Sequence, residues 1–335
     1  MQSVTQIPGV LAGHVTKADA GTGCTVLVFP QGAVGAVDVR GGAPATRETD
    51  LLRPENTVQQ VHAVILSGGS AYGLAASCGV ADELERAGIG LDVGVGIVPI
   101  VVGACLFDLG VGRADVRPTA EDGAGAVRAA MAERDVPASE RTPLEQGNVG
   151  AGTGCSVGKL AGATRAMKCG LGESVQTAGP LACGAVVAVN AFGGVVDPDT
   201  GERIAGLLSE DGTCVEDCVE AALALTAQTL EKDPRALSWL RTNTTISCVV
   251  TNAQLTQAQA TKVAQIAADG YAHAIRPVHT TNDGDTIFVV ATGDVPAGVD
   301  AVGMLATRAV EAAIVNAARA ATSAYGLKAA DSVHA

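Results

Sequence analysis

Short apolar runs of β-like character alternate with longer helical patterns along much of the chain. The first part contains the apolar runs "GCTVLVFP" (23–30) and "AVILSGG" (63–69), and a helical pattern follows directly over 70–88. The last part repeats this order, because a β-branched run over 244–252 precedes a helical pattern over 257–275. Strands that alternate with helices favour a layered α/β protein.

The C-terminal pattern continues with one more strand and one more helix. "GDTIFVVATG" (284–293) predicts the strand, and a long helical pattern follows over 301–322. Thr256 and Gln259 have the spacing of a capping box, which marks the start of the helix predicted after residue 256.

The middle of the chain is less regular. Residues 117–146 predict one helix and a loop, and a glycine-dense patch follows over 147–162. Two β-rich runs around "NAFGG" (190–194) within 183–197 predict a β-hairpin, with Asn and Gly at its turn. No segment is typical of a flexible linker, so we expect a single domain over 1–335.

Composition limits both the core and the partners. Apolar residues make up 47% of the chain and aromatic residues only 2%, so the core must come from small aliphatic side chains, which 42 glycines allow to pack closely. A net charge of −13 repels phosphate backbones, and few rings are available to stack on bases, so we expect no nucleic-acid partner. The N-terminus lacks a basic-then-apolar signal pattern, and no uninterrupted apolar run of about 18 residues occurs. We therefore expect a cytoplasmic protein with no membrane partner.

Nine cysteines are scattered along the chain without a C-x-x-C pair. Cys214 and Cys218 are four residues apart, so a helix would place them on one face, but no further zinc ligands lie close to them in the sequence. We expect reduced, structural cysteines, and neither a metal nor a cofactor.

The glycine-dense patch "GNVGAGTGCSVGKLAG" (147–162) does not match a phosphate-binding loop. Counting back from Gly158 and Lys159, Thr153 stands where a Walker loop needs its first glycine, and Leu160 stands where it needs a hydroxyl. Lys159 could be an ordinary solvated lysine. Its small neighbours favour instead a lysine that is desolvated and whose pKa is changed as a result.

Two carboxylates lie close together before the last predicted strand. Asp283 and Asp285 are two residues apart, so both can point into one site. A plain Asp-Gly turn would explain Asp283 and Gly284 but not Asp285. A metal site with His279 is conceivable, yet sites for hard cations usually draw on more acidic ligands.

No serine-based catalytic set is evident in the chain. "ILSGGSAYGLAA" (65–76) does not form a nucleophile elbow, because Tyr72 stands where the second glycine of Gly-x-Ser-x-Gly belongs. Ser70 is expected to cap a helix instead. The five histidines show no Ser-His-Asp arrangement.

The stretch "RTNTTISCVVTNAQLT" (241–256) offers a different nucleophile. A threonine hydroxyl needs a base close by, and a threonine at the start of a chain can use its own α-amine. Thr244 could become such a residue only through cleavage of the Asn243–Thr244 bond. The simpler interpretation is that Thr244 and Thr245 are ordinary β-formers behind a turn asparagine, and the residues alone favour it.

Six stretches occur in a characteristic order: "VRGGAPATRETDLL", "SGGSAYGLAA", "GNVGAGTGCSVGK", "VVAVNAFGGVVDP", "NTTISCVVTNAQLT" and "IRPVHTTNDGDTIFVVATG". Together they resemble the family of self-processing L-aminopeptidase/D-esterases, which includes the β-aminopeptidases and the nylon-oligomer endo-amidase. The resemblance implies an αββα four-layer sandwich like that of N-terminal-nucleophile hydrolases, with a connectivity shared with ornithine acetyltransferases. It also implies self-cleavage after Asn243 into 1–243 and 244–335, and a homo-oligomer that is a tetramer or larger.

The resemblance assigns roles to matched residues. Thr244 would be the nucleophile freed by cleavage, and Lys159 would help to activate its hydroxyl. Asn190 would donate to the oxyanion of the tetrahedral intermediate, and Asp283 and Asp285 would position the nucleophile and its amine. Threonine with Asp-Gly-Asp resembles the nylon-oligomer branch, because the β-aminopeptidase branch usually has serine and Ser-x-Glu.

These features predict a hydrolase of linear amide bonds that acts through an acyl-enzyme intermediate. Short peptides, aminoacyl amides and aminohexanoate oligomers are the expected substrates. Two alternatives stay open at this point. An acyltransferase of the ornithine acetyltransferase type would use the same intermediate, and an uncleaved chain would be a non-catalytic binding protein.

Overall fold

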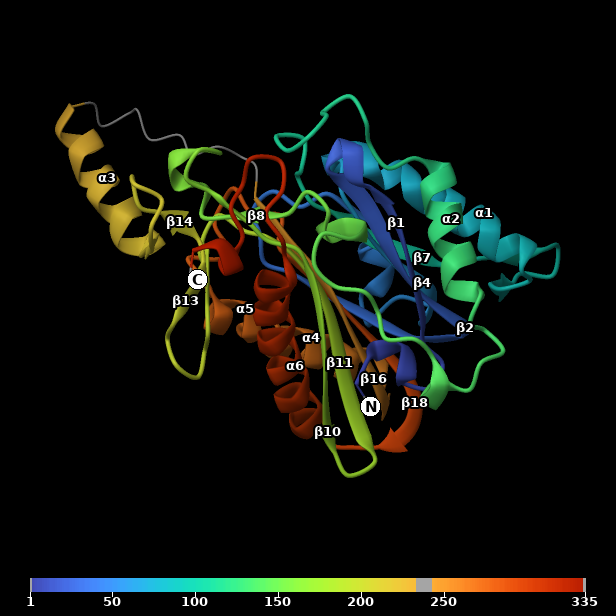
Figure 1. The fold of residues 1–335 in the computed structure, drawn as a ribbon. Helices are drawn as coiled ribbons and strands as arrows, with labels where there is room; N and C mark the ends of the chain where they lie inside the picture. Colours follow the sequence, from blue (N-terminus) through green and yellow to red (C-terminus); the bar gives the residue numbers. More distant parts are fainter. Residues whose placement is uncertain (1, 233–242, 334–335) are drawn as a thin grey trace.

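One large β-sheet forms the centre of the computed structural model, which describes residues 2–232 and 243–333 (Figure 1). Its strands are β1 Leu11–Lys17, β2 Thr22–Val39, β3 Thr46–Arg47, β4 Gln60–Ser67, β7 Val101–Cys105, β10 Leu171–Ala178, β11 Leu181–Asn190, β16 Thr244–Gln254 and β18 Thr286–Pro296. They run in the order β10-β11-β16-β18-β2-β4-β7-β3, and β1 pairs with β2 beside this path. Smaller sheets are formed by β5 Leu91–Asp92, β6 Ile97–Val98, β8 Ser156–Val157, β9 Met167–Lys168, β12 Gly194–Val196, β13 Arg203–Ala205, β14 Leu207–Leu208, β15 Val215–Glu216 and β17 Ile275–Arg276.

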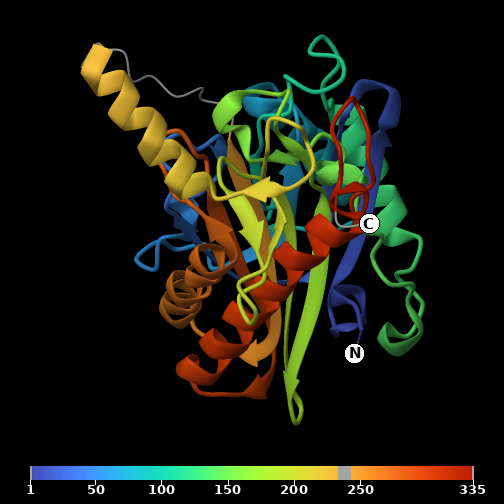
Figure 2. The same ribbon diagram turned by 60° about the vertical axis from the view of Figure 1, so that its left-hand side comes forward.

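Helices cover both outer faces of the large sheet. The helices of the described residues are α1 Ala76–Arg86, α2 Ala120–Met131, α3 Cys218–Lys232, α4 Gln257–Ala267, α5 Asp269–Ala274 and α6 Val299–Ala320, and all except α3 belong to these layers. α6 packs on β10 and β11 and α4 packs on β18, whereas α2 packs on β1 and β2, and α1 packs on β7. Between these helices, β16 lies against β4 and β7 without pairing with either strand, so the sheet folds back on itself. The layers therefore follow the order helix, sheet, sheet, helix, which confirms the expected αββα arrangement, and α3 lies apart from them (Figures 1 and 2).

The sheet folds back along β2, which is 18 residues long. The first half of β2 pairs with β1 and β4, and its second half pairs with β18. Its register with β4 shifts between Val28 and Ala33, where Pro30 has no N–H to donate to a neighbouring strand. Such an irregularity bends a strand, so β2 can belong to both sheet layers.

Small side chains let the layers approach one another closely. The buried core consists mainly of Ala, Val, Leu and Ile, as the composition predicts. Gly172 of β10 has no room for a side chain beneath α6, because a Cβ there would lie 2.1 Å from the carbonyl oxygen of Ala313. Among the described residues, α6 is the one helix long and apolar enough to cross a membrane, and 56% of that apolar stretch is buried inside the fold.

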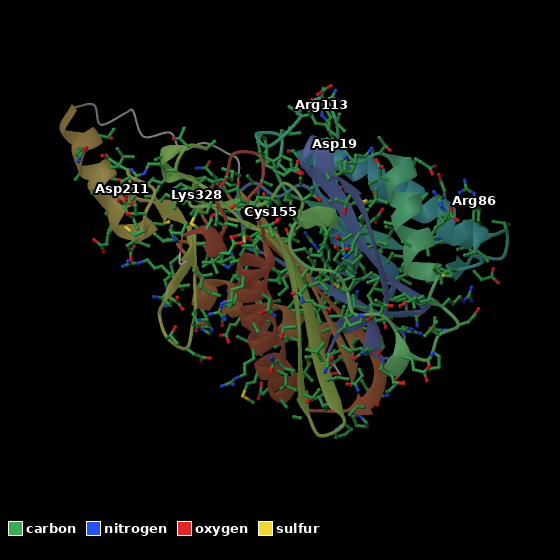
Figure 3. All side chains as sticks on the ribbon, in the orientation of Figure 1. Asp19, Arg86, Arg113, Cys155, Asp211 and Lys328 are labelled. Atoms are coloured by element: carbon green, nitrogen blue, oxygen red, sulfur yellow. The ribbon has the colours of Figure 1, made fainter. Side chains whose placement is uncertain are left out.

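Most charged side chains lie at the periphery of the fold, and most cysteines lie inside it. Figure 3 shows Arg86, Arg113 and Asp211 at the outer surface and Cys155 within the layers. All nine cysteines are free, and seven of them are buried. The seven buried cysteines act as small apolar side chains of the core.

The strands and helices predicted in the first and last parts of the chain are confirmed as β2, β4, α1, β16, α4, β18 and α6. The capping box is also confirmed, because Gln259 Oε1 accepts from the Thr256 N–H at 2.9 Å and Thr256 Oγ1 accepts from the Gln259 N–H at 3.3 Å. Ser70 does not cap a helix as expected. It begins a 3-10 turn with a φ of 54°, and α1 begins only at Ala76.

The hairpin predicted over 183–197 is wrong. β11 pairs with β10 and β16, whereas β12 pairs with β13 and β17 in a separate sheet. The connection between β11 and β12 passes close to another part of the chain, because a Cβ on Gly193 would lie 2.2 Å from the Pro277 carbonyl oxygen. Its glycines therefore serve a crossing between two sheets and not a tight turn.

Replacing Gly172 by alanine should destabilise the protein, because the new methyl group would push α6 away from β10. Overpacking of this kind typically costs about 1–3 kcal/mol of the free energy of unfolding. Gly96→Ala is a matched control, because no atom lies within 4 Å of a Cβ at Gly96. Chemical denaturation should show a lower midpoint for Gly172→Ala alone, and equal midpoints for the two variants would contradict this account.

Candidate active site

Three neighbouring strands bring residues singled out in the sequence to one edge of the sheet. Asn190, the last residue of β11, is directly opposite Thr244, the first residue of β16. On the other side of β16, Asn243 forms a bridge with Asp283, just before β18 begins. Asn190, Thr244 and Asp283 therefore lie at the same end of the sheet, with Asn190 beside Thr244 and Asp283 beside Asn243.

Thr244 is buried, and its hydroxyl lies against the preceding peptide bond. The Thr244 Oγ1 donates a hydrogen bond to the carbonyl oxygen of Asn243. The Gly284 N–H donates to the same oxygen at 3.1 Å. A Cβ on Gly284 would lie 2.8 Å from the Thr244 Oγ1, so the glycine leaves room for the hydroxyl. The Asn243–Thr244 peptide is thus contacted by a hydroxyl and polarised by an N–H.

Lys159 reaches the same edge from the 3-10 turn Lys159–Ala161, which ends the glycine-dense patch. Its ammonium donates to Asn190 Oδ1 at 2.6 Å and to the Asn190 carbonyl oxygen at 3.0 Å. The Gly158 N–H donates to the Gly193 carbonyl oxygen at 3.0 Å and so fixes the backbone in front of the lysine. Burial lowers the pKa of Lys159 to about 7, so a large share of these side chains is uncharged at neutral pH.

The side chain of Asn190 is completely buried and has a fixed orientation. Its Oδ1 accepts from the Ser156 N–H at 3.1 Å as well as from Lys159. Its Nδ2 donates to the Phe107 carbonyl oxygen at 2.8 Å. These hydrogen bonds to the oxygen and to the nitrogen fix the orientation of the Asn190 side-chain amide, and the nitrogen points toward Phe107.

The two carboxylates before β18 have different surroundings. Asp285 Oδ1 accepts from the Thr245 N–H at 2.7 Å, and Asp285 Oδ2 accepts from the backbone N–H and the ring of His279 at 3.0 and 2.9 Å. Asp283 Oδ2 accepts from the Thr280 N–H at 2.7 Å, whereas Asp283 Oδ1 is buried and has no hydrogen-bond partner among the described residues. Burial and the neighbouring Asp285 raise the pKa of Asp283 to about 6.

A loop near the N-terminus holds the backbone of both aspartates. The N–H groups of Arg40 and Gly41 donate to the Asp285 carbonyl oxygen at 3.1 and 3.2 Å, and the Ala43 N–H donates to the Asp283 carbonyl oxygen at 2.8 Å. The two segments are so close that a Cβ on Gly41 would lie 2.3 Å from the Asp285 nitrogen. The "VRGG" stretch of the sequence therefore supports the acidic pair.

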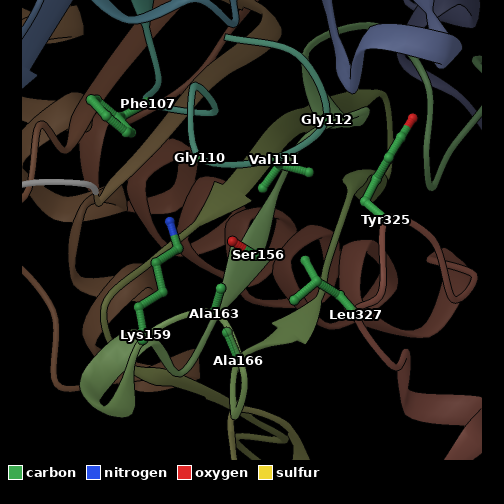
Figure 4. Close-up of a pocket in the computed structure, with 11 residues that line it drawn as sticks. Phe107, Gly110, Val111, Gly112, Ser156, Lys159, Ala163, Ala166, Tyr325 and Leu327 are labelled. Carbon is green, nitrogen blue, oxygen red and sulfur yellow. The ribbon is translucent and has the colours of Figure 1, made fainter.

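A cavity of about 200 Å³ opens beside Lys159 (Figure 4). Its walls are mainly apolar, and they come from the Phe107–Gly112 loop, from residues 156–166 and from the C-terminal residues Tyr325 and Leu327. Figure 4 shows Lys159 on one side of the cavity and Tyr325 and Leu327 on the other. The cavity can accept an uncharged chain next to a lysine amine.

Three parts of the site had no role in the sequence analysis: His279 beside Asp285, the loop over 40–43, and Asp108. Asp108 is buried, and it accepts from the Thr22 hydroxyl at 2.6 Å. It is close enough to Lys159 for their charges to interact, and burial raises the pKa of Asp108.

The sequence analysis considered His279 only as a metal ligand. Within residues 2–232 and 243–333, no group of three His, Cys, Asp or Glu side chains is arranged to hold a metal ion. His279 and the loop over 40–43 lie in stretches that carry the family resemblance. That resemblance was the one feature of the sequence that could have identified them as parts of the site.

Comparison with known sequences gives consistent matches along the chain. The model of peptidase family S58 matches residues 2–331. An uncharacterized aminopeptidase of Mycobacterium leprae is 45% identical over 306 residues, which are 89% of this chain and 80% of that protein. A 6-aminohexanoate-oligomer endohydrolase of Paenarthrobacter ureafaciens is 31% identical over 297 residues, which are 86% of this chain and 74% of that protein.

A solved structure supports the fold. The L-aminopeptidase D-Ala-esterase/amidase from Ochrobactrum anthropi, described as a variant of the Ntn hydrolase fold, superposes with a TM-score of 0.66 over 95% of this chain and 86% of that chain. The two sequences are 17% identical, so this similarity concerns the layered architecture alone. Because the family model covers nearly the whole chain, the protein belongs to peptidase family S58 and is a hydrolase of peptide or amide bonds.

Proposed function

We propose that the protein is a self-processing hydrolase of linear amide bonds, in which cleavage of the Asn243–Thr244 bond makes Thr244 an N-terminal nucleophile. One observation carries the proposal: the Thr244 hydroxyl donates to the Asn243 carbonyl oxygen, which also accepts the Gly284 N–H. A hydroxyl in this position is adjacent to the carbonyl carbon that it has to attack. Membership of a peptidase family supports the same chemistry on a substrate.

In self-cleavage, Thr244 Oγ1 forms a bond to the carbonyl carbon of Asn243. The peptide C–N bond then breaks as its nitrogen takes up the hydroxyl proton, which leaves an ester to the Thr244 side chain and a free α-amine. Water hydrolyses this ester and leaves a carboxylate on Asn243. Negative charge builds on the Asn243 oxygen during the attack, and the Gly284 N–H at 3.1 Å is placed to stabilise it.

In turnover, the same hydroxyl forms a bond to the carbonyl carbon of a substrate amide, and the C–N bond breaks as the nitrogen takes up a proton and leaves as an amine. Water then hydrolyses the acyl-enzyme, which releases the acid and restores the Thr244 hydroxyl. A threonine hydroxyl needs a base for this attack. The Lys159 amine suits this role, because a pKa of about 7 lets it accept a proton at neutral pH. Asn190 is directly opposite Thr244 in the strand pairing, and this position supports its proposed role as a donor to the oxyanion of the intermediate.

The acidic pair would position the nucleophile on both of its sides. Asp285 accepts from the N–H of Thr245, the residue after the nucleophile. Asp283 pairs with Asn243, the residue before it, and has a buried carboxylate oxygen with no hydrogen-bond partner among the described residues. Cleavage would create an ammonium group at Thr244, the residue that follows the bridge partner of Asp283. Such a cation would offset the burial of the Asp283 charge and hold the new N-terminus in place.

The cavity beside Lys159 supports a linear, aliphatic acyl group. Its volume of about 200 Å³ and its mainly apolar wall suit a short hydrocarbon or peptide chain. The relatives named above are an aminopeptidase and an endohydrolase of 6-aminohexanoate oligomers, so short peptides, aminoacyl amides and such oligomers are the proposed substrates.

The state of assembly and the cellular location remain predictions. Leu223 and Leu225 of α3 and Met304 of α6 are exposed apolar side chains. The expected homo-oligomer, a tetramer or larger, would bury some of these side chains between subunits, and the cytoplasmic location stays a prediction from the sequence.

Purified protein should separate into two fragments on a denaturing gel, because the Thr244 hydroxyl is already in contact with the Asn243 carbonyl. N-terminal sequencing of the smaller fragment should give Thr-Thr-Ile-Ser. Thr244→Ala should remain one chain, whereas the exposed Thr213→Ala should be cut like the wild type. An intact wild-type chain, or a fragment with a different first residue, would refute the assignment of Thr244.

The Lys159→Ala variant should lose most of its turnover, by about 10²–10⁴-fold, which is the range typical of general acid–base catalysis. In the wild type, kcat should rise as the pH increases through about 7, because the amine is a base only when it is deprotonated. Lys159→Arg should not restore activity, because a guanidinium stays protonated. Lys262→Ala on the exposed face of α4 is the control and should keep the wild-type rate. A processed Lys159→Ala enzyme with a near-normal rate would exclude this role.

Enlarging a side chain in the cavity wall should select against longer acyl groups. Val111→Trp should raise the KM for a hexanoyl amide by about 10-fold or more, the scale on which apolar pockets discriminate, and change the KM for an acetyl amide much less. Val93→Trp, at an exposed position away from the cavity, serves as the control. Both variants should still be processed. A KM that rises equally for both amides would place the acyl group elsewhere.

A further inference from the structure

His279 contacts the acidic pair in a way that its sequence position does not explain. Its backbone N–H and its ring Nδ1 both lie within hydrogen-bonding distance of Asp285 Oδ2, at 3.0 and 2.9 Å. Asp285 Oδ2 accepts from the backbone N–H, and it accepts from the ring in the tautomer that carries the hydrogen on Nδ1. The two contacts meet at one oxygen because His279 has a φ of 57°, a left-handed conformation that is uncommon outside glycine.

The other oxygen of the same carboxylate contacts the strand that carries the nucleophile. Asp285 Oδ1 accepts from the Thr245 N–H at 2.7 Å, and Thr245 directly follows Thr244. The carboxyl group of Asp285 is 1% exposed, so water does not compete for either oxygen. A rotation of this carboxylate would break one contact or the other. The imidazole of His279 therefore fixes the position of the group that holds Thr245.

The imidazole is itself supported from its other side. The ring of Tyr271 lies 5.6 Å from the ring of His279, centre to centre, at an angle of 30°. The Tyr271 hydroxyl is 2.6 Å from Ser247 Oγ on β16 and 3.1 Å from the Thr286 carbonyl oxygen on β18. Tyr271 is buried and anchored to both strands, so it leaves His279 little freedom to move away from Asp285.

We propose that His279 is a positioning residue for the nucleophile: its imidazole holds the Asp285 carboxylate in the one orientation that fixes Thr245 and, through it, the Thr244 hydroxyl. The proposal rests on the proposed role of Thr244. His279 does not touch the hydroxyl or the scissile carbonyl, and it acts through Asp285. It should affect both self-cleavage and turnover, because both reactions start from the same Oγ1.

Three substitutions separate the hydrogen bond from the backbone conformation. His279→Asn keeps a side-chain N–H close to the place of Nδ1, and asparagine tolerates a positive φ. His279→Gly also accepts this φ but has no side-chain donor. His279→Ala lacks the donor and is strained at this φ, so it loses both features. His273→Asn, at an exposed position on α5, is the matched control.

His279→Asn should be cut and should turn over a substrate amide nearly as the wild type does. His279→Gly should be cut slowly, and its kcat should fall by about 10- to 100-fold with little change in KM, because a small misplacement of a reacting group has effects of this size. His279→Ala should be at least as impaired as His279→Gly, and His273→Asn should be unaffected. Thermal denaturation of each variant shows whether a loss of rate follows a loss of fold.

Two results would overturn the proposal. One is a folded His279→Gly variant with wild-type cleavage and kcat, since the imidazole would then be dispensable. The other is a folded His279→Asn variant that is as slow as His279→Gly, since a donor to Asp285 would then be insufficient. Thr244→Ala run in parallel separates this inference from the proposed function. If Thr244→Ala remains active, the nucleophile is misassigned, whereas an inactive Thr244→Ala beside a normal His279→Gly refutes the role of His279 alone.

Discussion

The position of β16 between β11 and β18 is the constraint on which the candidate site depends. Antiparallel pairing with β11 sets Thr244 opposite Asn190, and the parallel neighbour β18 sets Asp283 beside Asn243. Successive side chains of a strand point to opposite faces of the sheet. A shift of β16 by one residue would therefore turn every side chain of β16, including that of Thr244, to the opposite face. Thr244 would then lose the asparagine, the Gly284 N–H and the acidic pair together.

Polar contacts along β16 hold this register, although nearly all of the strand is buried on both faces. At the far end of the strand, Thr251 Oγ1 donates to the Ala182 carbonyl oxygen at 2.8 Å, and Asn252 Oδ1 accepts from the Ala182 N–H at 2.8 Å. In the middle, Ser247 contacts the Tyr271 hydroxyl. Apolar burial alone would allow the strand to slide, whereas each buried hydrogen bond would be lost in a shifted register.

The layered α/β architecture could be predicted from the sequence because its strands and helices are local patterns. The two-residue spacing of Asp283 and Asp285 predicted that both point into one site, which stays a prediction, and their charges are close enough to interact. The pairing of Asn190 with Thr244 could not be predicted from the sequence, because it depends on which of several buried strands lie next to each other in the sheet. The spacing also could not show that Asp285 has three N–H partners while one oxygen of Asp283 has none among the described residues. Those partners come from the folded backbone. The contact of Lys159 with Asn190 was also not predicted, because the family resemblance linked Lys159 only with the Thr244 hydroxyl.

The strand order also sets a sequence of events. Residues after Asn243 supply β16 and β18, which lie between β11 and β2 from the earlier part of the chain, and they supply α6, which covers β10 and β11. The Asn243–Thr244 peptide meets its hydroxyl, N–H and carboxylate neighbours only after β16 has been inserted into the middle of the sheet. If this bond is cut as proposed, folding must come first, because an unfolded chain has no site with which to cut itself. Every cleaved molecule would then be one whose central sheet had been completely assembled before the cut, even if it later unfolds.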